Sequence, residues 1–370
     1  MQLDGKRVLI TGAGSGIGRA LAIEASRLGM TVALCGRRAE ALHATLSEMA
    51  PGGRHLRLQG DITNQAVRRG LRDYLWRHWG GLDVLVNNAG VVVVGPLAYT
   101  TDADLERVMA TNVVAPAALS RELLPLLRRA APSRIVNVGS MFGDIAYPLF
   151  AAYSASKFAL RGLSIALRRE FKPLGIGVTY AAPRATKTDA AAAFDPLVEP
   201  MQMRIDDPAR VAAHIWRAVA QDADTAYARG AERLFVLAQR LVPKLVDRAI
   251  SAQMLDQRIK DYLKKSHEAA KERSAPRSAG SGQPATAAGA VTAPQGAARI
   301  TDADGRAGQQ LGAKSPKERG ALSPSHGSAA RDLSRQAGPF RGKTIRSEFG
   351  DEANLEEVEI GAEVLPTRGQ

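Results

Sequence analysis

The sequence predicts an α/β fold in which helices cover both faces of a parallel sheet, followed by a helical extension and a disordered tail. Over the first 190 residues, short runs of β-branched residues alternate with amphipathic helical stretches. A glycine-rich turn, residues 12–18, directly follows the first of these runs. This alternation favours a doubly wound sheet. From residue 269 the chain consists mainly of Ala, Gly, Ser, Pro and Gln, a composition that favours disorder.

The individual strands and helices are predicted from the apolar runs and from the residues that end them. Gly29 and Pro51 are typical of helix ends. Residues 104–129 are expected to contain one long helix, and Asp207-Pro208 indicates the cap and first turn of another. The expected strands are 7–11, 31–35, 55–58, 82–86, 134–138 and 177–181, and the other expected helices before residue 190 are 16–28, 39–49, 64–78 and 150–171.

Charge and composition divide the chain of 370 residues into three parts, 1–228, 229–267 and 268–370. The net charge is +13, and the last part is almost neutral. Residues 229–265 have leucines at spacings of three and four, interleaved with arginines, and Pro243 is expected to split or kink this helical stretch. The leucine face alone would serve for packing on the core or on a subunit partner, which we favour. Peripheral membrane contact would use the leucines and the arginines.

Composition excludes several classes of protein. Cys35 is the single cysteine, so an intramolecular disulfide and a cysteine-cluster metal site are excluded, and we expect no metal. No apolar run is long enough to span a bilayer, and the first residues lack the apolar core of a signal peptide. We therefore expect a cytoplasmic protein, with membrane-peripheral attachment as the alternative. The arginines are scattered and no recognition helix is evident, so nucleic acid is not an expected partner.

The turn T-G-x-x-x-G-x-G, from Thr11 to Gly18, is typical of a dinucleotide-binding site. Glycines let the backbone approach a diphosphate, and the following helix N-terminus offers free N–H groups. An acid at the end of the second strand would bind both adenosine-ribose hydroxyls, but Arg37 and Arg38 stand there instead. They favour NADP(H) over NAD(H) by bonding a 2′-phosphate, unless they only begin a solvated helix. Asp61 is placed to meet the adenine amino group, to cap the next helix, or both.

Tyr153 and Lys157 are separated by one helical turn, which puts the phenol and the ammonium group on one face of a helix. A nearby cation stabilises phenolate and is expected to lower the pKa of the tyrosine toward the range of an acid–base catalyst. Ser140 ends the fifth strand and residues 87–90 (N-N-A-G) end the fourth, where ligands of such sheets bind. Asn112 lies inside a predicted helix, a poor place for asparagine unless it has a partner.

Together these motifs resemble those of the classical short-chain dehydrogenase/reductase (SDR) family, over about residues 4–222. The glycine-rich turn, the N-N-A-G motif and Ser140, thirteen residues before the Y-x-x-x-K pair, match in order and spacing. The resemblance implies a Rossmann-fold catalytic domain, residues 1–228, that transfers a hydride between nicotinamide and a carbonyl or secondary alcohol. A catalytically idle NADP-sensing protein on the same fold is the alternative. A homo-oligomer formed through the helices at 104–129 and 150–171 is also implied.

The resemblance implies a role for each matching residue. Tyr153 would be the acid or base at the carbonyl oxygen, and Ser140 would orient that oxygen. Lys157 would bind the nicotinamide ribose, and Asn112 would hold a water molecule linked to this lysine. The implied cofactor-binding residues are Gly12, Ser15, Gly16, Ile17, Gly18, Arg37, Arg38, Asp61, Ile62, Asn88, Ala89, Gly90, Tyr153, Lys157, Pro183 and Thr188.

Arg184 departs from the family pattern, in which a glycine follows Pro183. It could select an anionic substrate group, or point to solvent from a tolerant turn, which we favour. The residues between Ser140 and Tyr153, and those after Thr188, are small or soft apolar ones. They suggest an apolar or acyl-type substrate, although core packing would explain them too. The candidates are Met141, Phe142, Gly143, Tyr147, Phe150, residues 190–193, Phe194, Leu197, Met201 and Met203.

Overall fold

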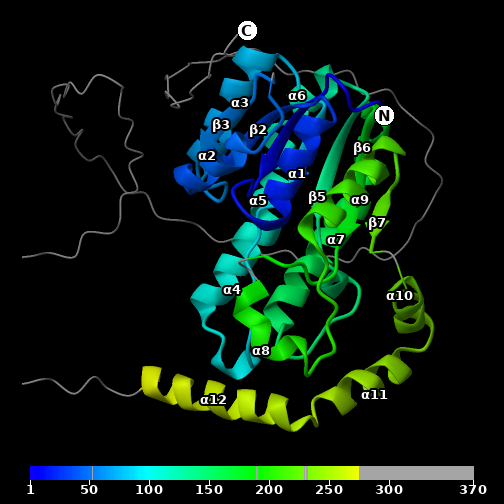
Figure 1. The fold of residues 1–370 in the computed structure, drawn as a ribbon. Helices are drawn as coiled ribbons and strands as arrows, with labels where there is room; N and C mark the ends of the chain where they lie inside the picture. The colour runs from blue at the N-terminus through cyan, green and yellow to red at the C-terminus, as the bar shows by residue number, and fades with distance from the viewer. Residues whose placement is uncertain (52, 189–190, 229, 231, 275–370) are drawn as a thin grey trace, which may run out of the picture. The chain divides into compact units, whose positions relative to one another are not determined.

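The structure, a computed structural model, describes residues 1–274 except 52, 189–190, 229 and 231 (Figure 1). All described residues belong to one compact unit. The predicted disordered tail also lies outside the described residues, apart from 268–274, which continue the last helix.

Seven parallel strands form one sheet, which confirms the predicted doubly wound α/β architecture. The strands are β1 (Arg7–Thr11), β2 (Thr31–Gly36), β3 (Leu56–Gln59), β4 (Val84–Asn87), β5 (Ser133–Val138), β6 (Ile176–Ala182) and β7 (Thr225–Tyr227). Their order is β3-β2-β1-β4-β5-β6-β7, so the direction of winding reverses between β1 and β4 and the carboxyl ends open a crevice there. The seventh strand was not predicted, because three residues are too few to show a periodicity.

Helices cover both faces of this sheet, and the alternation of side chains along β1 shows how (Figure 1). The covering helices are α1 (Gly16–Arg27), α2 (Ala39–Ser47), α3 (Gln65–Trp79), α5 (Ala115–Glu122), α6 (Leu124–Arg129), α7 (Ala151–Phe171) and α9 (Pro208–Ala220). Val8 and Ile10 pack in one apolar cluster with α1, α2 and α9, whereas Leu9 packs in another with α3, α5 and α6. Trp216 of α9 is fully buried, and its Nε1 donates to the Leu21 carbonyl oxygen of α1 at 3.0 Å.

The helix predicted over 104–129 is interrupted. It consists of α4 (Asp102–Met109), a π-helical turn (Ala110–Val114), α5 and α6. Pro116 and Pro125 lie in the first turns of α5 and α6. A proline cannot donate a backbone hydrogen bond to the preceding turn, so these residues mark sites where the helix restarts. The interruption matters because the π-helical turn carries Asn112.

Three helices follow β7: α10 (Glu232–Leu241), α11 (Pro243–Gln253) and α12 (Gln257–Ser274). Pro243 begins α11, which confirms the predicted split at this residue. Val236, Val246 and Ile259 are buried, one from each helix. The three helices therefore pack one side against the rest of the unit. Figure 1 shows α11 and α12 below the short helix α8 (Asp195–Val198) in this view.

Candidate active site

The turn between β1 and α1 forms one wall of a groove of about 970 Å³, which is lined by the loops at the carboxyl ends of the strands. Gly12 and Gly16 have left-handed backbone conformations, with φ of +66° and +54°, which other residues rarely adopt. Ser15, the N-cap of α1, makes no side-chain capping hydrogen bond. The first N–H groups of α1 therefore have no side-chain cap and can bind an anion.

Fifteen of the sixteen predicted cofactor-binding residues line the groove: Gly12, Ser15, Gly16, Ile17, Arg37, Arg38, Asp61, Ile62, Asn88, Ala89, Gly90, Tyr153, Lys157, Pro183 and Thr188. Gly18 does not line it. A Cβ at Gly18 would lie 2.2 Å from the Gly12 oxygen, so this glycine lets α1 approach the turn. Asn88 joins β4 to the same turn, because its Nδ2 donates to the Thr11 carbonyl oxygen at 2.9 Å and its N–H to Thr11 Oγ1 at 3.0 Å.

Arg37, Arg38 and Asp61 lie at the ends of β2 and β3 and line the same part of the groove. Both arginines are exposed. Asp61 Oδ1 accepts hydrogen bonds from the N–H and the hydroxyl of Thr63, at 2.9 and 2.7 Å. The prediction that Asp61 caps the next helix is wrong, because Asn64 caps α3 by accepting from two N–H groups of its first turn.

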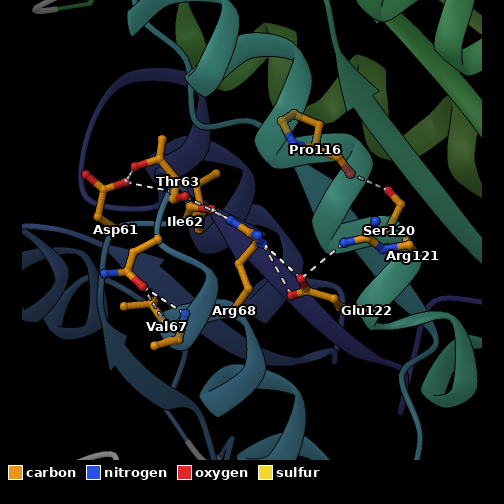
Figure 2. Close-up of polar contacts among 11 residues, drawn as sticks. Asp61, Ile62, Thr63, Val67, Arg68, Pro116, Ser120, Arg121 and Glu122 are labelled. Carbon is orange, nitrogen blue, oxygen red and sulfur yellow. Dashed lines mark hydrogen bonds and ion pairs between the residues drawn. The ribbon is translucent and has the colours of Figure 1, made fainter. Parts of the chain in front are cut away.

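A buried ion pair holds the loop that carries Asp61 and Ile62 (Figure 2). Arg68 Nε on α3 lies 3.2 Å from Glu122 Oε2 on α5, and both side chains are 8% exposed. Arg68 Nη1 donates to the carbonyl oxygens of Ile62 and Thr63, at 2.8 and 3.0 Å. The guanidinium group therefore ties this loop to α5. This pair was not predicted from the sequence, because both residues resemble ordinary charged residues on solvated helices.

Ser140, Tyr153 and Lys157 meet at the opposite end of the groove. Ser140 follows β5, and its Oγ accepts the N–H of Phe142 at 3.1 Å. The Ser140 side chain acts on the Tyr153 phenol, whose pKa it tends to lower. Lys157 Nζ lies 5.5 Å from the centre of the Tyr153 ring and donates to the Val138 carbonyl oxygen at 3.0 Å. The structure thus brings together the serine, the tyrosine and the lysine that the sequence analysis selected.

Burial determines the ionisation of this pair. It raises the pKa of the Tyr153 phenol to about 12, and the Ser140 side chain opposes that rise. Burial lowers the pKa of the Lys157 ammonium group to about 8. The tyrosine pKa is therefore raised, and not lowered as the sequence suggested, because the loss of water around the phenol is the largest effect on it. At neutral pH the phenol is protonated and can act as an acid.

Asn112 holds α7 in position and does not line the groove. Its Oδ1 accepts the N–H of Val91 at 2.9 Å, and its Nδ2 donates to the Val91 carbonyl oxygen and to Ser156 Oγ, both at 3.0 Å. Val91 follows β4, and Ser156 lies on α7 between Tyr153 and Lys157. The π-helical turn therefore links the loop after β4 to the helix that carries Tyr153 and Lys157.

Tyr180 on β6 supports the loop that carries Ser140, a role that the sequence analysis missed. Its hydroxyl donates to the Ser140 carbonyl oxygen at 3.0 Å and accepts the Ser140 N–H at 3.4 Å. The ring fills the space beside two glycines, since a Cβ at Gly139 or Gly143 would lie 2.2 Å from atoms of Tyr180. Gly139 and Gly143, on either side of Ser140 in the sequence, were the one sign that a large side chain packs beneath this serine.

Tyr180→Phe is expected to lower kcat about ten-fold with unchanged cofactor affinity. The variant removes both hydrogen bonds to the Ser140 backbone, each worth about 1 kcal/mol, and leaves the serine hydroxyl less well positioned. Steady-state kinetics and fluorescence titration with NADPH would measure the two quantities. Tyr74→Phe, on α3 and outside the groove, is the matched control. A wild-type kcat in Tyr180→Phe would contradict the positioning role.

Apolar side chains line the groove beyond Tyr153. Four of the predicted substrate candidates do not line the groove: Gly143, Ala192, Ala193 and Leu197. Gly143 packs beneath Ser140 against Tyr180, Leu197 is fully buried in an apolar cluster, and Ala192 and Ala193 are exposed to solvent. Residue 190 lies outside the described residues. Those that do line the groove are Met141, Phe142, Tyr147, Phe150, Ala191, Phe194, Met201 and Met203.

Helices α10 and α11 also line this end of the groove, which the sequence analysis did not foresee. The residues are Phe235, Ala238, Leu245, Val246, Ala249, Ile250 and Gln253. Asp144, whose side chain is fully buried, holds α10 in place. It accepts the Tyr227 hydroxyl at 3.0 Å and lies 3.2 Å from Arg161 Nε and 3.6 Å from Arg240 Nη2 of α10.

Arg184 forms an ion pair at the base of the segment 185–206. Its Nε and Nη2 lie 3.0 and 2.7 Å from the two carboxylate oxygens of Asp206. Two backbone hydrogen bonds join the same two ends of this segment. The Lys187 N–H donates to the Asp206 carbonyl oxygen at 2.9 Å, and the Asp206 N–H donates to the Ala185 carbonyl oxygen at 2.8 Å. The favoured prediction that Arg184 points to solvent is therefore wrong, because Asp206, distant in sequence, binds it.

Comparison with known proteins identifies the family. The family model described as short chain dehydrogenase matches residues 6–197. An uncharacterized oxidoreductase of Thermotoga maritima is 35% identical over 193 residues, 51% of this chain and 75% of the relative. An NADPH-dependent pterin aldehyde reductase of Arabidopsis thaliana is 37% identical over 166 residues, 45% of this chain and 69% of the relative. The chain belongs to the short-chain dehydrogenase/reductase family and is an oxidoreductase.

Solved structures of this family share the fold. A short-chain dehydrogenase from Streptomyces avermitilis has 31% sequence identity and a TM-score of 0.58, covering 69% of this chain and 100% of that one. A short chain dehydrogenase/reductase from Burkholderia phymatum, solved in complex with NAD, has 26% identity and a TM-score of 0.60, covering 66% and 96%. These similarities confirm the Rossmann-type fold, in a family that binds a nicotinamide cofactor.

Proposed function

We propose that this protein is a cytoplasmic, NADP(H)-dependent oxidoreductase that transfers a hydride between nicotinamide and an apolar or acyl-type carbonyl compound, or the corresponding secondary alcohol. One observation carries the proposal. Ser140, Tyr153 and Lys157 meet in a groove that has a glycine-rich turn at one end and apolar side chains at the other. Such a groove can hold a dinucleotide and a carbonyl substrate end to end.

The groove fits a dinucleotide in its shape and in its donors. The uncapped first turn of α1 offers N–H groups to a diphosphate. A Cβ at Gly16 would lie 2.8 Å from Thr188 Cγ2, so the glycine-rich turn faces the segment after β6 at close range. Ile62 would hold the adenine, Lys157 the nicotinamide ribose, and Thr188 the carboxamide. When bound, the nicotinamide would give or accept the hydride.

Arg37 supports NADP(H) as the cofactor. Its side chain is exposed and lines the groove directly after β2, where an acid would be needed to bind both ribose hydroxyls. A guanidinium group can form paired, charge-assisted hydrogen bonds with a 2′-phosphate. One relative is NADPH-dependent by name and one structural neighbour holds NAD, so the family accommodates both cofactors. We therefore base the choice of NADP(H) over NAD(H) on Arg37, the residue directly after β2.

Tyr153 donates its phenolic proton to the carbonyl oxygen during reduction and removes a proton from the alcohol during oxidation. The Ser140 hydroxyl oxygen already accepts the Phe142 N–H, so its own proton is available to orient the same substrate oxygen. Lys157 uses one of its three protons for the Val138 carbonyl oxygen. Its charge stabilises the phenolate that remains after proton transfer.

The exposed apolar residues of α4, α7 and the π-helical turn support a homo-oligomer. Met109, Val114 and Phe158 are exposed, although they are large and hydrophobic. They lie on the two helical regions through which the family resemblance implies subunit contacts. Burial of these side chains against a second copy would remove apolar surface from water, and a two-fold interface would use the same patch twice.

The proposal predicts that the purified protein oxidises NADPH faster than NADH with apolar ketones, aldehydes or acyl thioesters. Small polar carbonyl compounds should react more slowly, because they leave the apolar end of the groove unfilled. The decrease in NADPH absorbance across a substrate panel measures both preferences. Tight NADPH binding without turnover on any member of the panel would contradict the catalytic proposal. It would support the idle NADP-sensing alternative instead.

A further inference from the structure

The outward side of α10 and α11 carries a ridge of leucines, which we define as Leu234, Leu237, Leu241 and Leu245. These side chains are 68%, 51%, 70% and 62% exposed. The spacing of three and four residues puts Leu234, Leu237 and Leu241 on one side of α10, and Leu245 follows in the first turn of α11. More than half of the exposed large hydrophobic side chains in the described part of the chain lie between residues 234 and 255. Such a concentration marks an interaction surface.

The opposite side of the same helices is firmly attached. Val236 and Val246 are buried, and they share an apolar cluster with Ile145. Arg240 reaches the buried carboxylate of Asp144 at 3.6 Å. Apolar packing and an ion pair therefore hold the inner side of these helices against the rest of the protein. This attachment keeps the leucine ridge facing outward.

The ridge is continuous with the substrate end of the groove. Phe235 and Leu245 line the groove and are also largely exposed, so they form part of its rim. Ala249 and Ile250, one turn further along α11, also line the groove. An apolar molecule could pass from the ridge to the vicinity of Tyr153 along hydrophobic side chains.

The charge around the ridge favours an anionic surface. Lys244 and Arg248 flank Leu245 on α11 and are exposed, and neither forms an ion pair with a described residue. Asp247 is the exposed acid on the same helix. Over residues 229–265 the sequence has nine lysines and arginines against four acids. Two copies of so basic a surface would repel each other, whereas anionic lipid headgroups would attract it.

We propose that the leucine ridge docks on the surface of an anionic lipid bilayer, and that apolar substrates enter the groove from the bilayer past Phe235 and Leu245. No helix among the described residues is both long and apolar enough to cross a membrane. The contact is peripheral, with leucines at the boundary between headgroups and acyl chains and basic residues at the phosphates. The docking step is independent of the proposed function, whereas the substrate route rests on the proposed function.

Co-sedimentation of the full-length protein with lipid vesicles tests the docking. We expect binding to vesicles of phosphatidylcholine with phosphatidylglycerol, and weaker binding to phosphatidylcholine alone or at high salt. Leu237→Gln combined with Leu241→Gln should weaken binding at least about ten-fold. Neither residue lines the groove. Trp76→Gln combined with Leu97→Gln is the matched control, because it removes two exposed apolar side chains elsewhere. Circular dichroism and NADPH binding would show that both variants fold.

Two results in the vesicle assay would overturn the docking proposal: no binding by the wild-type protein, or equal binding by the ridge variant. A third would be a wild-type protein that forms a dimer and binds no vesicles, while the ridge variant is a monomer. The last result would assign the ridge to a second copy of the chain. For the substrate route, the ridge variant should reduce a vesicle-embedded ketone more slowly and a water-soluble one at the wild-type rate. Vesicle binding without any carbonyl reduction would leave the docking intact and refute the proposed function.

Discussion

Tyr153→Phe is expected to lower the turnover of carbonyl reduction about a thousand-fold while leaving NADPH affinity within about two-fold of wild type. The variant keeps the buried ring but removes the phenolic proton that is proposed to be transferred to the substrate oxygen. Ser140 and Lys157 remain in place, because the serine is held by Phe142 and Tyr180 and the lysine by Val138. Turnover is measured by stopped-flow NADPH oxidation, and affinity by fluorescence titration.

The pH dependence separates this chemical role from a structural one. Because burial raises the pKa of the Tyr153 phenol to about 12, the acid form persists through neutral pH and reduction should be nearly independent of pH there. Alcohol oxidation needs the phenolate, so its rate should rise with pH, and this rise should be absent in Tyr153→Phe. Tyr74→Phe serves again as the control. A reduction rate in Tyr153→Phe equal to that of wild type would refute the mechanism.

Arg37→Glu is expected to lower kcat/KM for NADPH by about a hundred-fold and to make NADH the better cofactor. The substitution removes the charge-assisted hydrogen bond that we propose Arg37 makes to the 2′-phosphate, and it adds a carboxylate that would repel this phosphate. The same carboxylate can accept hydrogen bonds from the two hydroxyls of an unphosphorylated ribose. Together these effects amount to about 3 kcal/mol against NADPH, with each ten-fold change corresponding to about 1.4 kcal/mol.

Kinetics with both cofactors on one substrate would measure this change of preference. Arg69→Glu is the control, since Arg69 is an exposed arginine on α3 that does not line the groove and gives the same change of net charge. The control should alter neither cofactor by more than about two-fold. An unchanged ratio of NADPH to NADH efficiency in Arg37→Glu would show that the 2′-phosphate is not read at this position.

Local patterns in the sequence predicted the parts of the fold and site that depend on residues close together in the chain. The glycine-rich turn needs left-handed glycines directly after a strand, and Gly12 and Gly16 adopt that conformation. The spacing of Tyr153 and Lys157 is a property of one helix, so it survives any arrangement of the other elements. Parallel strands joined by helices also constrain the topology strongly, which is why the sheet was predicted correctly but for its shortest strand.

Contacts between residues distant in sequence were not predictable in the same way. Arg68 and Glu122, like Arg184 and Asp206, are ordinary charged residues until the fold brings them together and removes most of their water. The predicted roles of Asp61 as a helix cap and of Arg184 as a solvent-facing residue were wrong, since the partners of both depend on how the loops fold. Burial likewise raised the pKa of Tyr153, which was expected to be lowered.

The sequence by itself determined the family, the glycine-rich turn and the selection of Ser140, Tyr153 and Lys157 as candidate catalytic residues, because each rests on residue type and spacing along the chain. Only the tertiary structure decided what surrounds them. It placed Tyr180 beneath Ser140, put the side chain of Asn112 between two elements, and laid α10 and α11 along the substrate end of the groove. The physical reason is that the burial of a side chain and its bonding partners depend on how the elements pack together. The spacing of residues along one element, by contrast, is fixed by the sequence.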